Sequence, residues 1–356
     1  LHTVVHSFPT RRSSDLFSGG KGTVSTMKIG LQNIFSGGSG TVSTIYNWFG
    51  SQNIFSGGKG TVGTINNGFQ SISNGGVGTV STINGGNQTI SSGGSGTVST
   101  MNGGAQTVSA GGVGTVRALN SGTQAVLTGG TAANTTINGG TQNIASGGTA
   151  LATEVSGGMM QLASGGIVSG LTMTGGSLEL SAVSGGSFAI NGTLSATNAS
   201  IDMTDHSFGR NRAFIPPAYE TLTIDKLSGS GNTFIMVTDL GSDNDSKSDK
   251  LIFKDADVGI HYVQIRDLSK LNGIQVTGEH KQLLITDNSG KLTFEGKGFN
   301  AGGLWDIDPT LAKGDTLGQS ANNWYLTKVA KTANNDTRVL LEAANNSYAL
   351  WRNTND

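Results

Sequence analysis

Apolar residues recur through the first half of the chain at a spacing of 18 residues, with one interval of 20. Gly-Gly pairs repeat at the same spacing between Gly19 and Gly165. This repeat predicts one small structural unit copied along a stack, so that equivalent positions form columns. Three apolar columns are expected to face a common core: Ile34, Ile54, Ile72, Ile90, Val108, Val126, Ile144, Leu162 and Leu180; Met27, Ile45, Ile65, Ile83, Met101, Leu119, Ile137, Val155 and Met173; and Val24, Val42, Val62, Val80, Val98 and Val116.

Each repeat contains short segments that are typical of β-strands. Residues 79–83 and 88–90, for example, are rich in β-branched side chains and are flanked by Gly, Asn and Ser. A second glycine pair lies midway through most repeats, as at Gly85 and Gly86, where a positive φ costs glycine little. The pattern therefore predicts that one repeat forms one coil.

Other repetitive architectures fit this pattern less well. Glycine at this density would cost on the order of 1 kcal/mol per site inside helices, and collagen needs glycine at every third position. Chains dominated by Gly, Ser, Thr and Asn often stay disordered, but apolar columns kept in register through nine copies favour a packed core. We therefore predict an all-β fold, a right-handed single-stranded parallel β-helix (solenoid) with coils of about 18 residues spaced roughly 4.8 Å apart.

Two polar columns accompany the apolar ones. The first comprises Asn66, Asn84, Asn102, Asn120 and Asn138, and the second Gln32, Gln52, Gln70, Gln88, Gln106, Gln124 and Gln142. Identical amides at strand spacing can form hydrogen bonds along the stack. Asn-Gly turns alone would also explain the Asn column, whereas turns explain the Gln column less readily. A surface role therefore stays open for both columns, as ladders through which copies of the chain associate.

The sequence pattern divides the chain into four segments. Residues 1–15 do not join the repeat register and are interpreted as a foreign or disordered prefix on a protein truncated upstream. Residues 16–198 form the regular repeat, and residues 199–300 are expected to continue it in irregular coils with longer loops. Residues 301–356 are expected to cap the solenoid, because bulky aromatics gather there: Trp305, Trp324, Tyr325, Tyr348 and Trp351.

Charge is low and unevenly distributed. The 356 residues carry a formal net charge of −1 and include no cysteine, which is compatible with export through an oxidising compartment. Residues 17–198 hold only two acidic and four basic side chains, whereas twenty acidic and sixteen basic residues follow. This shift supports a boundary near residue 199. The near-neutral balance and the lack of a basic stripe argue against nucleic acid as a partner.

Two sets of motifs resemble a known family. Gly-Thr-Val-Ser-Thr-Ile-Asn-Gly-Gly at 78–86 and Gln-Thr-Ile-Ser-Ser-Gly-Gly at 88–94 resemble the repeats of autotransporter adhesins of the AIDA type and of the antigen 43 group. Leu-Ser-Gly-Ser-Gly at 227–231, Asp-Lys-Leu at 249–251 and Asn-Trp-Tyr-Leu at 323–326 resemble the pertactin-like passenger region and its C-terminal autochaperone segment. The resemblance implies a secreted passenger on the surface of a Gram-negative-type bacterium. It also implies export through the passenger's own outer-membrane β-barrel, which is missing from this chain.

The sequence lacks the usual catalytic and metal-binding motifs. The Gly-Asp-Ser-Gly motif of serine proteases is absent, with Gly314-Asp315-Thr316 as its nearest relative, and His206, His261 and His280 are expected to be surface or packing residues. Thr or Ser occupies the position at which Asp would bind calcium in a Gly-Gly-x-Gly-x-Asp repeat. A polysaccharide-degrading site would find only Glu154 and Glu179 in the regular coils. We therefore expect no enzyme, no metal and no cofactor.

The one lengthened repeat contains the aromatic residues Tyr46, Trp48 and Phe49. Its two extra residues must bulge from the stack, where exposed aromatics would suit contact with a host glycan or receptor. The alternative is that these side chains pack over Phe35 and Phe55 near the N-terminal end.

Two functions follow as expectations. The first is an adhesin that binds copies of itself on neighbouring cells and so mediates aggregation and biofilm formation, because many weak polar contacts along a repetitive, nearly uncharged face add up through avidity. The second is an adhesin module that binds a host surface glycan or protein through the lengthened repeat or the loops after residue 199.

Overall fold

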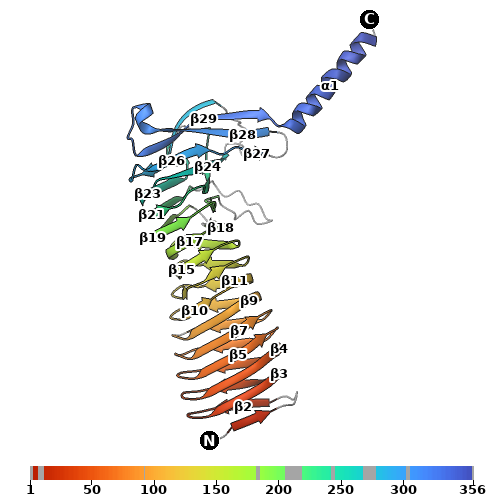
Figure 1. Cartoon of the computed structure of the whole chain (residues 1–356), viewed down its shortest axis with the longest axis vertical. Coiled ribbons are helices and arrows are strands. Elements are labelled where there is room, and N and C mark those ends of the chain that lie inside the picture. Colours follow the sequence, from red (N-terminus) through yellow and green to blue (C-terminus); the bar gives the residue numbers. More distant parts are fainter. Residues whose placement is uncertain are drawn as a thin grey trace.

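The computed structural model describes residues 3–6, 12–91, 93–181, 185–204, 219–241, 245–267, 278–301 and 305–354. These residues form a rod of stacked strands that rises from the N-terminal to the C-terminal end (Figure 1). Neighbouring coils pair in parallel, and equivalent residues are 18 positions apart through most of the regular segment. The predicted all-β parallel solenoid is therefore confirmed.

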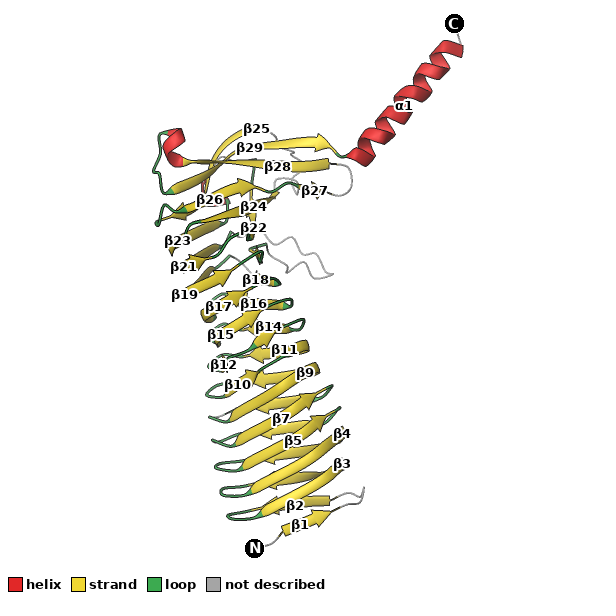
Figure 2. Cartoon of the chain, viewed as in Figure 1, coloured by secondary structure: helices red, strands yellow, loops and turns green. Residues whose placement is uncertain are grey.

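The first eighteen strands build the regular coils. Most coils contribute two segments, and some pairs of segments merge into one long bent strand (Figure 2). The bounds are β1 Thr3–His6, β2 Arg12–Leu16, β3 Lys21–Ile34, β4 Ser39–Ile54, β5 Lys59–Ile65, β6 Phe69–Ile72, β7 Val77–Ile83, β8 Asn87–Ile90, β9 Ser95–Val108, β10 Val113–Val116, β11 Leu119–Val126, β12 Thr131–Ala133, β13 Thr136–Ile137, β14 Thr141–Ile144, β15 Thr149–Val155, β16 Met159–Ala163, β17 Ile167–Met173 and β18 Ser177–Ser181.

The apolar columns form the interior of these coils. Ile72 of β6 pairs with Ile90 of β8, and Ile65 of β5 pairs with Ile83 of β7, so identical side chains lie directly above one another. The columns are buried almost completely, with exposed fractions of 0 or 1% at Ile34, Ile54, Ile65, Ile72, Ile83, Ile90, Val108, Val126, Ile137, Ile144 and Leu162. Burial of a complete aliphatic side chain stabilises the fold by about 1.5–3 kcal/mol. Each coil buries several such side chains against its neighbours, so the contributions add up along the stack.

Glycine permits the close turns between strand segments. Gly104 has a φ of 73°, and a Cβ built on it would lie 2.2 Å from the carbonyl oxygen of Gly86 in the preceding coil. Any side chain there would push the coils apart and would also strain the backbone. The glycine pairs therefore set both the direction of the turn and the spacing of the stack.

The prediction that residues 1–15 lie outside the register is wrong for the described part of this segment. Thr3–His6 pairs with Lys21–Val24, and Arg12–Leu16 pairs with Gly30–Ile34, both at the spacing of 18. Parallel pairing needs only extended backbone, so the missing glycine pair does not prevent it. Leu16 is 5% exposed and extends the column of Ile34 by one coil.

Larger coils follow the regular segment. Ser187 of β19 pairs with Thr221, 34 positions later, and Thr221 pairs with Lys250, 29 positions later. Longer loops account for the extra residues, while the pairing stays parallel. The strands are β19 Ser187–Ala196, β20 Ser200–Asp202, β21 Thr221–Ser228, β22 Thr233–Thr238, β23 Lys250–Ala256, β24 Gly259–Asp267, β25 Gly278–Asp287 and β26 Leu292–Gly296, with a 3₁₀ turn at Asp245–Lys247.

An antiparallel layer closes the C-terminal end. Its strands are β27 Phe299–Ala301, β28 Trp305–Lys313 and β29 Asn323–Ala333, with a 3₁₀ turn at Gly314–Leu317. Strand β29 pairs with β25 of the last coil and with β28, and together they cross the end of the rod (Figure 2). The ring of Trp324 lies 5.6 Å from that of Phe294, and both Trp324 and Tyr325 are less than 10% exposed.

The helix α1, Asn335–Thr354, projects away from the rod. Tyr348 lies on this helix and is 62% exposed, so the prediction that it belongs to the aromatic cap is wrong. The side chains of Trp305 and Trp351 are outside the described part of the chain. The cap is therefore built around Trp324 and Tyr325, which β29 holds against the last coil.

Candidate interaction surface

The Asn column forms a continuous ladder along one edge of the rod. The amide nitrogen of Asn84 donates to the Oδ1 of Asn66 at 3.1 Å, and Asn102 donates to Asn84 at 3.3 Å. Asn120 and Asn138 continue the ladder at 3.0 and 2.8 Å. The residue that precedes each ladder position is a buried member of the apolar column, such as Ile83, which fixes the turn from which the amide points outward.

Half of the hydrogen-bonding capacity of this ladder stays available. An asparagine amide has two N–H groups and two acceptor lone pairs, and the ladder uses one of each at interior positions. Asn84, Asn102, Asn120 and Asn138 are exposed to solvent. The result is a straight row of fixed amides, about 4.8 Å apart, that can bind a partner without rearranging.

The Gln column forms a second ladder, and its location corrects the prediction of a surface role. Gln70, Gln88, Gln106, Gln124 and Gln142 are 0% exposed, and each Nε2 donates to the Oε1 of the preceding glutamine at 2.6–2.8 Å. Gln88 lies two residues before Ile90 and therefore points to the same, inner side of the strand. These glutamines satisfy one another inside the core, and self-association through them is excluded.

The aromatic residues of the lengthened coil remain on the surface. Tyr46, Trp48 and Phe49 are 49, 59 and 72% exposed. The indole of Trp48 lies 5.6 Å from the ring of Phe69 in the next coil, at an interplanar angle of 53°. Ile29 in the preceding coil pairs in register with Phe49 and is also exposed. This apolar patch interrupts an edge of the rod that elsewhere carries small polar residues.

A second aromatic feature was missed in the sequence. Phe17, Phe35 and Phe55 stack along the rod with centroid separations of 4.8 and 5.0 Å and nearly parallel rings. Their spacing of 18 and 20 residues follows the repeat. The signal that could have identified them is their common position, one residue after the buried column of Leu16, Ile34 and Ile54.

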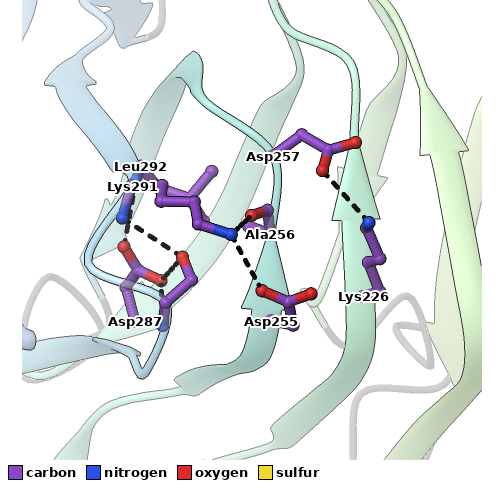
Figure 3. A network of polar contacts seen from close by, with 8 residues as sticks. Lys226, Asp255, Ala256, Asp257, Asp287, Lys291 and Leu292 are labelled. Atoms are coloured by element: carbon purple, nitrogen blue, oxygen red, sulfur yellow. Dashed lines mark hydrogen bonds and ion pairs between the residues drawn. The ribbon is translucent and has the colours of Figure 1, made fainter.

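Surface ion pairs connect the larger coils. Lys291 reaches Asp255 at 3.2 Å and the carbonyl oxygen of Ala256, while Lys226 reaches Asp257 at 3.1 Å (Figure 3). Hydrogen bonds from the lysines hold the pKa values of Asp255 and Asp257 below their ordinary value. Exposed pairs of this kind are screened by solvent and contribute little to stability, so we assign them a structural role.

His261 is a buried packing residue. Its ring is 0% exposed and lies among Phe234 and Phe294, and its Nδ1 accepts a hydrogen bond from Asn232 at 3.2 Å. Burial lowers the pKa of His261 from 6.5 to about 4. His280 is also buried, and His206 lies outside the described residues.

Within the described residues, no three His, Cys, Asp or Glu side chains lie close enough together to hold a metal ion. In the same part of the chain, no helix combines the length and the apolar character needed to cross a membrane.

Comparisons with known proteins point to the same class as the motifs. Residues 172–328 match the Pertactin family model. The crystal structure of a hyper-glycosylated TibA fragment, glycosylated by TibC, is 28% identical with a TM-score of 0.54, and the match covers 71% of this chain and 85% of that one. The Hap adhesin of Haemophilus influenzae is 17% identical with a TM-score of 0.38, and the match covers 89% of this chain but 39% of Hap. A search of curated proteins found no match.

The Pertactin match covers the larger coils and the start of the cap, and the TibA likeness extends over most of the chain. Together with the repeat and the parallel solenoid, these likenesses support a passenger of the autotransporter adhesin kind. A passenger of this kind is secreted and located at the cell surface.

Proposed function

We propose that this adhesin passenger binds copies of itself on neighbouring cells through the Asn ladder at Asn66, Asn84, Asn102, Asn120 and Asn138, and so promotes aggregation and biofilm formation. The observation that carries the proposal is that these amides are evenly spaced and only half satisfied, and that all of them except the half-buried Asn66 are exposed. It is proposed as a binding protein and not as an enzyme.

Repetition makes such a surface effective. A single amide–amide hydrogen bond contributes about 0.5–1.5 kcal/mol net, which is too little to hold two cells. Five amides on one rigid edge engage together, and many passengers on each cell multiply the contacts. The regular coils carry few charges, so two such edges approach without strong repulsion.

The proposal is tested with a triple variant, Asn66→Ala, Asn84→Ala and Asn102→Ala. These residues have ordinary negative φ values, so alanine fits the backbone. Light scattering of the purified chain against concentration should show association for the wild type and at least about tenfold weaker association for the variant. Bacteria that display the variant should clump less.

A matched control replaces three outward polar side chains of the same coils, Ser71→Ala, Thr89→Ala and Thr107→Ala. They lie on the strand segment that follows each ladder residue, in β6, in β8 and in the part of β9 beyond the bend at Gly104, where φ is 73°. The control should associate like the wild type. A wild type that stays monomeric at high concentration, or a control as defective as the Asn variant, would refute the proposal.

A second candidate function is favoured by the exposed patch at Tyr46, Trp48 and Phe49. We propose that this patch contacts a partner on a host cell, because large rigid aromatics are the residues that dominate recognition surfaces. Binding to host cells should then depend on the patch while clumping does not.

A further inference from the structure

Three columns of outward side chains lie side by side on the first coils. Strand alternation places them there, since the residues between them, such as Gln32 and Ile34, are completely buried. We call this surface the N-terminal face. Its columns are Leu31, Ser51 and Phe69; Asp15, Asn33 and Asn53; and Phe17, Phe35 and Phe55.

The middle column is a stripe of planar polar groups. Asn33 donates to the Oδ1 of Asp15 at 2.9 Å, and Asn53 donates to the Oδ1 of Asn33 at 2.9 Å. The Oδ1 of Asn53 in turn accepts from the hydroxyl of Ser51. Each amide therefore keeps one N–H, and the carboxylate of Asp15 keeps an oxygen, to bind a further group. The hydrogen bonds hold all three groups in fixed orientations.

Apolar side chains border this stripe, continuously on one side and partly on the other. The stacked rings of Phe17, Phe35 and Phe55 form a continuous wall, and Phe17 is 61% exposed. On the other side Leu31 stands in the coil of Asn33, the small Ser51 follows in the coil of Asn53, and Phe69 lies one coil further along, beside the indole of Trp48. Within a strand, alternate residues lie roughly 6.6–6.8 Å apart, so the stripe runs between these two sides as a band one residue wide.

We propose that the N-terminal face binds a neutral oligosaccharide that runs along the rod. A pyranose unit has apolar C–H faces and a rim of hydroxyl groups, which match aromatic walls and planar amides respectively. A sugar unit is about as long as the roughly 4.8 Å step between coils, so successive units meet successive members of the stripe. The proposal rests on the second proposed function and names its ligand class.

Charge selects neutral over acidic sugars. The only ionisable group in the three columns is Asp15, whose carboxylate would repel an acidic sugar. The lysines of these coils, Lys21, Lys28 and Lys59, stand outside the three columns, as does Arg12, whose side chain is outside the described part of the chain. A carboxylate beside amides instead accepts hydrogen bonds from sugar hydroxyls.

Titration calorimetry of the purified chain with cellohexaose, maltohexaose and hexagalacturonate tests the inference. At least one neutral hexasaccharide should bind with a dissociation constant of roughly millimolar or tighter, and the acidic one should bind more weakly. Trp48→Ala and Asn53→Ala should each lower the affinity about tenfold. Asn143→Ala removes the amide at the position equivalent to Asn53, and Leu127→Ala removes an exposed apolar side chain; both come from coils that lack the aromatic wall and should bind like the wild type.

The inference is overturned if no neutral sugar binds at millimolar concentration, if hexagalacturonate binds most tightly, or if Trp48→Ala binds as well as the wild type. Host cells give a second readout. Binding lost after enzymatic deglycosylation supports the proposal, whereas binding lost only after protease treatment identifies a protein partner and contradicts it. Light scattering separates this site from self-association, since Trp48→Ala should associate normally and the Asn66, Asn84 and Asn102 variant should keep its sugar binding.

Discussion

Replacing Gln70 by leucine should break the buried ladder at its most vulnerable point. The Oε1 of Gln52 would lose the donor at 2.8 Å, and the Nε2 of Gln88 would lose the acceptor at 2.6 Å. Both side chains are completely buried, and within the described residues neither of these two atoms makes another hydrogen bond. Each unsatisfied group costs about 1–3 kcal/mol, and the added apolar surface of leucine offsets about 1 kcal/mol. The expected loss is about 1–5 kcal/mol.

Gln32→Leu provides a matched control at the end of the same ladder. The Nε2 of Gln32 is buried and has no hydrogen-bond partner among the described residues, so removing it relieves a cost. The Nε2 of Gln52 would keep two longer contacts, to the carbonyl oxygens of Gly40 and Thr61 at 3.2 and 3.5 Å. We expect a change of stability within about 1 kcal/mol.

Hydrogen exchange measured by mass spectrometry is the suitable assay, because a solenoid opens locally around the damaged coil. Peptides that cover residues 51–90 should exchange faster in Gln70→Leu than in the wild type or in Gln32→Leu. Equal protection in the two variants would refute the argument that mutual satisfaction of the amides stabilises the core.

Acid should weaken the larger coils through His261. Its pKa falls from 6.5 to about 4 on folding, so the unfolded chain binds a proton first and stability is lost as the pH drops from 6.5 to 4. The shift corresponds to about 3 kcal/mol of stability. His261→Gln should therefore make the free energy of unfolding depend less on pH between 6.5 and 4, as measured by thermal unfolding at several pH values. An unchanged pH dependence in this variant would contradict the role assigned to His261. Gly93→Ala should cost about 1–2 kcal/mol for its positive φ alone. Gly104→Ala should cost more, because its Cβ also meets the backbone of Gly86. Thermal unfolding measures the loss of stability in both variants. Equal losses for Gly93→Ala and Gly104→Ala would contradict the claim that Gly104 sets the spacing between coils.

The regular coils could be predicted because every structural requirement repeats. The column of Ile72 and Ile90 and the glycine turns recur at one spacing, so each copy supports the same interpretation. The buried position of Gln88 was also accessible, since it shares strand parity with Ile90. Its polar character alone suggested a surface position, which is wrong. The amides of the column form hydrogen bonds with one another, so they can be buried without contact with water.

The less regular parts could not be derived in the same way. Arg12–Leu16 joins the stack through its backbone, which any extended segment can do. The number of residues between the paired positions Ser187 and Thr221 depends on the length of a loop, and no repeat in the sequence indicates that length. Tyr348 lies on a helix that projects away from the rod (Figure 1), and the number of aromatic residues in a segment cannot show that the segment leaves the stack. The outward stripe at Asn33 and Asn53 became visible only through the register of neighbouring coils.

Disulfide cross-linking tests the central claim, that copies meet edge to edge along the Asn ladder. The chain contains no cysteine, so Asn102→Cys introduces a single reporter on the ladder, and Thr107→Cys introduces one beyond the bend at Gly104 of the same coil. Under mild oxidation at a concentration where the wild type associates, Asn102→Cys should give a covalent dimer and Thr107→Cys should stay monomeric. Efficient cross-linking through Thr107→Cys, with none through Asn102→Cys, would contradict the account.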